Sequence, residues 1–165
     1  MLAVVSPSPP DELDVGDGEW RQWERFGESA ELLYREINAA LIARHDLGVP
    51  DLQLLNLLNA DARRPVRMGT LADALVLAPS RLTWQVGRLE VRGFVRRFPS
   101  REDKRGIVVG ITRQGQNHLR PALCTYALFV RQFYLAPLNR EQMTALGDGA
   151  RRVSDALKND CAATR

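Results

Sequence analysis

The segment from Met68 to Thr112 constrains the fold of this chain more than any other part of the sequence. It begins with two short helical patterns, and only three residues separate the first from the second, which starts at Pro79. Proline is favoured at the first helical position because its missing N–H would have no intrahelical partner there. Two runs of apolar and β-branched residues follow, Phe94 to Phe98 and Ile107 to Ile111, with a polar segment between them. These runs predict a β-hairpin with a long charged tip, so the expected order is helix, turn, helix, hairpin.

The second helix of this segment is predicted to have an apolar face and a polar face. Leu82, Val86 and Leu89 recur at helical spacing and predict the face that packs on a core. Polar and aromatic side chains are expected to point away from that face: Ser80, Arg81, Thr83, Trp84, Gln85 and Arg88. Arg92 and Gly93 are predicted to end the helix, since glycine is common directly after a helix.

The basic charge of the chain is concentrated in the same region. The whole chain of 165 residues carries a net charge of +3, whereas the stretch from Pro79 to Arg105 holds eight basic and three acidic residues. The basic residues are Arg81, Arg88, Arg92, Arg96, Arg97, Arg101, Lys104 and Arg105. A local excess of positive charge of this kind favours a polyanionic partner. The alternative interpretation is a solvated helix face with no partner.

A short helix, a tight turn, a second helix with a polar face and a basic hairpin form the order of a winged helix-turn-helix domain. The predicted fold is therefore mainly α with a small β-hairpin wing. The major groove of duplex DNA admits one helix, whose hydroxyl, amide and guanidinium groups reach phosphates and base edges. We expect the polar face of the helix to bind DNA together with six hairpin residues: Arg97, Ser100, Arg101, Asp103, Lys104 and Arg105. For Trp84 two positions stay open, contact with a sugar or a thymine methyl group, and packing inward against the wing.

Long helical patterns flank this domain on both sides. An apolar stripe with steps of three or four residues runs from Trp20 to Ala40, and a second long pattern follows Thr112, a candidate N-cap. A last helix is predicted to start at Asn139, with Gln142 placed to complete a capping box. The central lobe is too small to cover these apolar stripes, and a second copy of the chain is the simplest cover. We therefore predict a helical dimerisation lobe and a homodimer.

The predicted organisation divides the chain into five parts. Residues 1–18 are expected to be a flexible tail, because they combine three prolines with several acids and no apolar periodicity. The other parts are an N-terminal dimerisation helix and linker at 19–50, a winged helix-turn-helix lobe at 51–112, C-terminal dimerisation helices at 113–158 and a tail at 159–165. Within the lobe, residues 51–60 are apolar on most sides, which predicts a short helix buried on several faces.

Residues 103–115 resemble the wing signature of the MarR family of bacterial regulators. That signature reads Asp, any residue, Arg, three residues, Val, any residue, Leu, Thr, two residues and Gly, and here Ile111 alone departs from it. The stretch from Arg88 to Arg97 is similar to the end of the family's recognition helix, and the resemblance covers about residues 20–158. It implies that Arg105 enters the minor groove while Asp103 holds its guanidinium through a charge-assisted pair. A surface ion pair without that role is the alternative.

The resemblance also implies a function. It indicates a sequence-specific regulator that binds a pseudo-palindromic operator on double-stranded DNA as a homodimer. It further implies a repressor that a small anionic or aromatic ligand releases from DNA. The implied location is the bacterial cytoplasm, with nucleoid association when the protein is bound to DNA. The start of the chain agrees, because it has neither the basic residues nor the long apolar stretch of a secretory signal.

The sequence offers no constellation typical of catalysis or metal binding. His45 and His118 are the only histidines, and no cluster of cysteines or carboxylates accompanies them. Cys124 and Cys161 cannot form a disulfide framework, and neither has an evident reason for a lowered thiol pKa. We therefore expect no enzyme, no metal and no cofactor. Two alternatives stay open, a thiol-based redox-sensing regulator of the same fold and a winged-helix protein-interaction module that no longer reads DNA.

Overall fold

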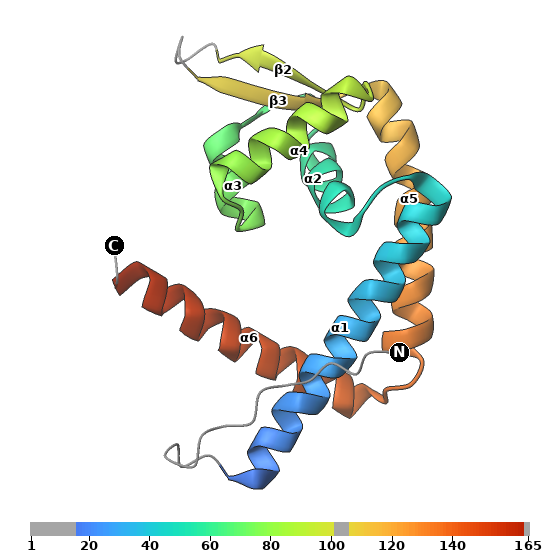
Figure 1. Cartoon of the computed structure of the whole chain (residues 1–165), viewed down its shortest axis with the longest axis vertical. Coiled ribbons are helices and arrows are strands. Elements are labelled where there is room, and N and C mark those ends of the chain that lie inside the picture. Colours follow the sequence, from blue (N-terminus) through green and yellow to red (C-terminus); the bar gives the residue numbers. More distant parts are fainter. Residues whose placement is uncertain (1–15, 101–105, 164–165) are drawn as a thin grey trace. The chain divides into compact units, whose positions relative to one another are not determined.

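The computed structural model describes residues 16–100 and 106–163 as six α-helices, one π-helical segment and three strands (Figure 1). In chain order these are α1 (Asp17–His45), α2 (Val49–Ala60), β1 (Val66–Arg67), α3 (Met68–Leu75), α4 (Pro79–Val91), β2 (Val95–Pro99), β3 (Ile107–Ile111), α5 (Arg113–Val130), the π-helix η1 (Arg131–Leu135) and α6 (Arg140–Ala163). The chain divides between Tyr126 and Ala127 into two compact units. No helix in the described ranges is long and apolar enough to cross a membrane.

The predicted hairpin is present, and it forms a sheet with one additional strand. β2 and β3 pair antiparallel, with Val95 opposite Ile111 and Pro99 opposite Ile107. The two-residue strand β1 adds to the other edge of β3 to give the order β1-β3-β2. Sequence periodicity did not predict β1, because two residues are too few to produce an alternating pattern. The predicted fold class, mainly α with a small β wing, is confirmed.

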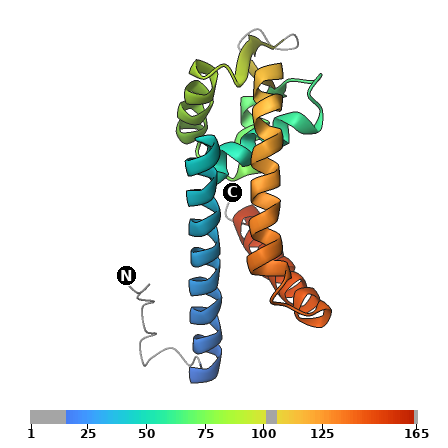
Figure 2. The same cartoon turned by 90° about the vertical axis from the view of Figure 1, so that its right-hand side faces the viewer.

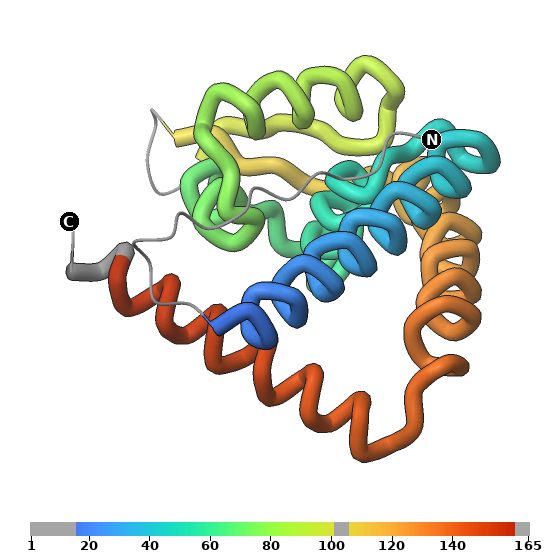
Figure 3. Tube along the Cα trace, turned by 60° about the horizontal axis from the view of Figure 1, so that its bottom comes forward, coloured from blue at the N-terminus to red at the C-terminus, as the bar shows by residue number. Residues whose placement is uncertain are grey.

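The core of the lobe is built by leucines and valines from every element around the sheet. Side chains that are at most 2% exposed come from α2, α3, α4, β2 and β3: Leu54, Leu55, Leu58, Leu71, Leu82, Val86, Leu89, Val95 and Val109. The prediction that the helix after Gly48 is buried on several faces is confirmed, since six of its residues are buried. α4 packs alongside β2, as Figure 3 shows, and this packing presents the other side of α4 outward.

The turn between α3 and α4 contains a strained residue. Val76 takes a left-handed backbone conformation, φ 52°, while the N–H of Leu77 donates to the Ala72 carbonyl at 2.9 Å. A left-handed conformation is unusual for a β-branched residue. The Val76 side chain gains nothing by packing, because it is 90% exposed. Pro79 then begins α4, as its preference for the first helical position predicts.

α5 is fastened to the end of the hairpin by a cap and a close contact. The predicted N-cap, Thr112, accepts a hydrogen bond from the Gly115 N–H at 3.0 Å, and its hydroxyl donates to the Gly93 carbonyl at 2.7 Å. A Cβ at Gly115 would lie 2.2 Å from the Phe94 carbonyl oxygen, so only glycine fits there. These contacts connect the wing to the first turn of α5.

Figure 2 shows α1 as a single unbroken helix. Several side chains of its apolar stripe are exposed. Only Ile37 and Leu41 of this helix are buried, whereas Trp23, Phe26 and Tyr34 are 50% exposed or more. The predicted stripe therefore exists, but the described part of the chain leaves several of its side chains uncovered.

The second unit is helical and begins with the last residues of α5. In it Phe129 and Phe133 pack with ring centroids 5.6 Å apart at the start of η1. The capping box predicted before α6 is confirmed, since the N–H of Asn139 donates to Gln142 Oε1 at 3.0 Å and the N–H of Gln142 donates to Asn139 Oδ1 at 2.9 Å. Three large apolar side chains of α6 are exposed: Leu146, Val153 and Leu157.

Candidate nucleic-acid interface

The outward side of α4 carries most of the side chains predicted to lie there. Ser80, Arg81, Thr83 and Trp84 are exposed. The Trp84 side chain is 67% exposed, so it does not pack inward against the wing. Glu90 is the only acidic residue of α4. The outward side of the helix therefore combines hydroxyl, indole and guanidinium groups and suits an anionic surface.

The prediction that Gln85 points outward is wrong. Gln85 is 4% exposed, and its Nε2 donates a hydrogen bond to Asp51 Oδ1 at 3.2 Å. Gln85 stands three residues after Leu82 and four before Leu89, which places it on the buried stripe of a helix with 3.6 residues per turn. Its amide is tolerated there because the buried Asp51 of α2 supplies an acceptor.

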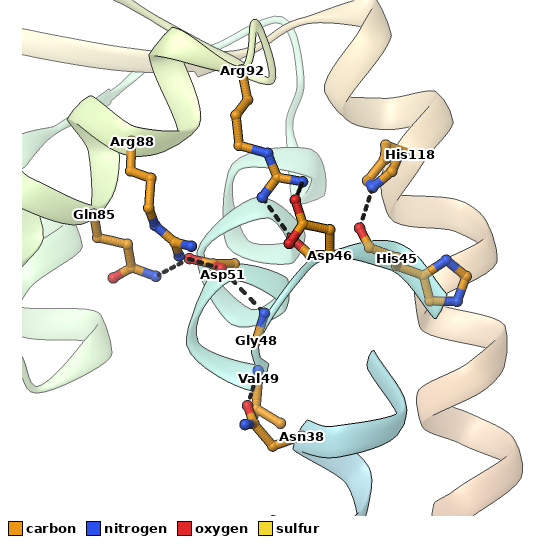
Figure 4. A network of polar contacts seen from close by, with 10 residues as sticks. All are labelled: Asn38, His45, Asp46, Gly48, Val49, Asp51, Gln85, Arg88, Arg92 and His118. Atoms are coloured by element: carbon orange, nitrogen blue, oxygen red, sulfur yellow. Dashed lines mark hydrogen bonds and ion pairs between the residues drawn. The ribbon is translucent and has the colours of Figure 1, made fainter. Parts of the chain in front are cut away.

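Asp51 is the centre of a polar network that sequence analysis did not predict (Figure 4). Its carboxylate is 2% exposed and forms a short ion pair with the guanidinium of Arg88, whose side chain is 40% exposed. The same carboxylate accepts a hydrogen bond from the Gly48 N–H at 3.2 Å and so caps α2. Arg88 was predicted to bind DNA. Its side chain is partly exposed on α4, and its guanidinium is also paired with this buried carboxylate.

A second contact fixes the end of α4 to the same junction between α1 and α2. Arg92 Nη2 lies 3.1 Å from Asp46 Oδ2, and Arg92 Nη1 donates to the Asp46 carbonyl at 2.6 Å. The Asn38 side chain supports the junction from α1 by accepting the Val49 N–H at 2.9 Å. Arg88 and Arg92 are one helical turn apart, so two points of α4 are held by two acids of one short segment.

The two histidines join α1 to α5 and to the wing. His118 Nε2 donates to the His45 carbonyl at 2.7 Å, and its ring stacks on Phe94 with centroids 4.6 Å apart. His45 Nε2 and the Thr125 hydroxyl share a hydrogen bond of 2.8 Å. Burial lowers the pKa of His45, and the nearby charges of His118 and Arg44 add to the effect. The residues that the structure describes contain no group of three possible metal ligands.

Arg97 is positioned between the wing and α4. Its Nη2 donates to the Thr83 carbonyl in the middle of α4 at 3.0 Å, and its Nε lies 3.6 Å from Glu90 Oε2. The Arg97 N–H also donates to Glu90 Oε1 at 2.9 Å. A Cβ at Gly87 would lie 3.2 Å from Arg97 Nη2, so the glycine leaves the space in which this guanidinium crosses the helix. These contacts, which we call the Arg97 brace, hold strand β2 at a set position against α4.

Five other wing residues were predicted to bind DNA, and the structure describes only one of them, Ser100. Ser100 was among the residues predicted to bind DNA, but it is 7% exposed and offers little surface to a partner. Its N–H donates to the Gly106 carbonyl at 2.8 Å, directly beyond the last residue pair of the β2–β3 ladder. The predicted site residues Arg101, Asp103, Lys104 and Arg105 lie outside the described residues.

A cavity of about 300 Å³ lies between α4 and the junction of α1 and α2. Trp84 and Arg81 line one side, Ile42 and Pro50 line the other, and Asp51 and Arg88 are also at its wall. The cavity thus offers an aromatic ring, an aliphatic side and guanidinium groups.

The two cysteines were considered as candidates for a redox-sensing thiol. Cys124 is exposed on α5, and the side chain of Cys161 lies outside the described residues.

Comparison with known proteins gives consistent results. Residues 50–107 match the model of the MarR family. The chain is 30% identical over 114 residues to YfiV of Bacillus subtilis, described as an uncharacterized HTH-type transcriptional regulator, and the match covers 69% of each chain. Two MarR family transcriptional regulators from Streptomyces coelicolor are similar in structure. Sco3205, solved in complex with DNA, has a TM-score of 0.83 and 32% identity over 87% of this chain and 93% of its own. AbsC has a TM-score of 0.82 and 26% identity over 88% and 97%.

Proposed function

The chain belongs to the MarR family of transcriptional regulators, and on that premise we propose that it binds duplex DNA as a homodimer and represses transcription. Members of this family are transcriptional regulators and not enzymes. The observation that carries the proposal is the outward side of α4, which combines exposed hydroxyl, indole and guanidinium groups within a winged helix-turn-helix frame. Further support comes from Sco3205, the relative whose structure contains DNA.

In this proposal α4 enters the major groove and the wing reaches the adjacent minor groove. Ser80, Arg81, Thr83 and Trp84 contact phosphates and base edges, with Arg88 at the margin. Arg105 is the minor-groove residue and Asp103 orients it, while Arg101 and Lys104 supply phosphate contacts. Arg97 contributes its charge from beside α4, where the Arg97 brace holds it.

The dimer is proposed to form through the helices that flank the winged lobe, in residues 19–50 and 113–158. Exposed apolar side chains on α1 and α6 support this, because a stripe of this kind is stable in water only when another surface covers it. A symmetric dimer presents two copies of α4 about 34 Å apart, one turn of DNA, and so selects a pseudo-palindromic operator. We place this complex in the bacterial cytoplasm, on the nucleoid.

A small anionic or aromatic ligand is proposed to release the protein from DNA. The cavity beside Trp84 supports this, since an aromatic ring and the guanidinium of Arg81 suit a small aromatic acid. A ligand there would displace α4 relative to the junction that holds it. A coupling free energy of about 1–3 kcal/mol is enough for a 5- to 150-fold change in DNA affinity.

The test is a gel shift with the DNA upstream of the chain's own coding sequence, at several salt concentrations. Affinity is expected to fall steeply as salt rises, because binding releases counterions from the phosphates. Arg105→Ala is expected to abolish the shift without changing the mass of the dimer or its helix content. Arg151→Ala, which removes an arginine from the charged side of α6, is the matched control and is expected to bind normally. Normal binding by Arg105→Ala would refute the wing assignment.

A further inference from the structure

Trp84 occupies an unusual position on α4. It stands opposite the buried stripe of Leu82, Val86 and Leu89, and its side chain is 67% exposed. Its neighbours one turn away on the same side are Ser80 and Arg81 before it and Gly87 and Arg88 after it. The indole is therefore exposed between two small residues and two arginines.

The orientation of the indole is set by a charged residue that is itself fixed. The guanidinium of Arg88 lies over the Trp84 ring, 5.2 Å from its centroid, in the geometry of a cation–π contact. The buried carboxylate of Asp51 holds that guanidinium by an ion pair. A chain of contacts from α2 through Arg88 thus restricts a side chain that is otherwise exposed.

The chemistry of an indole limits what it can recognise in a major groove. Its only polar group is the Nε1–H, so it has no acceptor for the amino groups of adenine or cytosine. Its remaining surface is apolar, and the C5-methyl of thymine is the apolar group that the major groove presents. A phosphate or a base acceptor is served better by the arginines and hydroxyls that flank Trp84.

We propose that Trp84 is a specificity-determining residue that packs on a thymine methyl group in the major groove. This inference rests on the proposed function, because it requires that α4 enters DNA. It assigns a sequence preference to a single side chain: each half-site contains a thymine at the position facing Trp84. Arg88 and Asp51 act as positioning residues for the contact.

The experiment compares two DNA fragments that differ only in thymine methyl groups. The upstream fragment is amplified once with dTTP and once with dUTP, and the affinity of the wild-type protein for each is measured at one salt concentration. Loss of a buried methyl group weakens binding about fourfold per half-site, and about fifteenfold when both half-sites of the dimer lose it. Wild-type protein is therefore expected to bind the uracil fragment about fifteenfold more weakly.

Variants of α4 then test whether Trp84 causes the difference in affinity between the two fragments. Trp84→Ala is expected to bind both fragments equally, with the affinity that the wild type has for uracil DNA or lower. Trp84→Phe keeps an aromatic surface and is expected to retain part of the preference. Arg81→Ala, on the same helix, is the matched control, and it should weaken binding to both fragments alike and keep the wild-type ratio. Helix content and dimer mass identify any variant that fails to fold.

The results that would contradict the methyl contact differ from those that would contradict the proposed function. Equal binding of both fragments by the wild type would refute the methyl contact and leave the proposed function intact. A preference that persists in Trp84→Ala would mean that another residue or the shape of the DNA reads the methyl groups, and would also refute the inference. Failure of the wild type to bind either fragment would refute the proposed function, and the inference with it.

Discussion

The winged lobe and helix α6 place their apolar side chains in opposite environments. Leu54, Leu71 and Leu89 of the lobe are completely buried, whereas Val153 and Leu157 of α6 are more than 60% exposed. Both regions have the apolar spacing of a packed helix, so the sequence pattern alone does not distinguish them. The lobe therefore contains all the elements it needs to form a core. The stripe on α6, in contrast, needs a surface that the described part of the chain does not supply.

The largest expected effect comes from a leucine in each region. Leu82→Ala removes a side chain that is 1% exposed and is expected to lower the free energy of unfolding by about 3 kcal/mol, because it loses apolar burial and leaves a cavity. Leu157→Ala is expected to leave the fold of the lobe unchanged and to weaken dimerisation at least about tenfold, because the proposed dimer interface would bury this leucine. Urea denaturation and light scattering, each at several protein concentrations, measure the two effects.

The same two variants also test whether a partner or the chain itself covers α6. If Leu157→Ala lowered the stability of the lobe and dimerisation stayed unchanged, α6 would be covered within its own chain. The exposed leucine would then be no sign of a partner.

The second prediction concerns the polar part of the core. Asp51→Ala removes the acceptor of the Gln85 amide and the partner of Arg88, and it is expected to cost about 2 kcal/mol of unfolding free energy. The loss of unfolding free energy stays moderate because the Arg88 side chain is 40% exposed and water can solvate its guanidinium when the carboxylate is absent. Asp46→Ala, whose carboxylate is 86% exposed, is the control and is expected to cost less than about 0.5 kcal/mol. Equal losses for the two variants in urea denaturation would contradict the role assigned to burial.

The sequence predicted the helices and the hairpin of the winged lobe, though not β1, because each of them has its own local signal. Pro79 marks a helix start, Thr112 a cap, and the β-branched runs mark the hairpin. The polar network was not predictable in this way, since Asp51 and Gln85 are 34 residues apart and each is ordinary in its own segment. The spacing of Gln85 from Leu82 and Leu89 did indicate burial, but its polar character outweighed that signal in the prediction. Arg97 likewise has a basic side chain that suits DNA, and only the fold shows that it also contacts the Thr83 carbonyl.

The smallest expected effect tests how the lobe joins its wing to α4. Alanine in place of Gly87 gains about 1 kcal/mol of helix propensity. Its Cβ would lie 3.2 Å from Arg97 Nη2, so the guanidinium has to shift by a few tenths of an ångström and its hydrogen bond to the Thr83 carbonyl weakens. We therefore expect Gly87→Ala to change the unfolding free energy little in the wild type and to stabilise the Arg97→Ala variant by about 1 kcal/mol. The coupling between the two sites is expected to be about 0.5–1 kcal/mol in a double-mutant cycle measured by urea denaturation. Equal effects of Gly87→Ala in both backgrounds would mean that the guanidinium moves aside without loss, and that the lobe does not depend on the Arg97 brace.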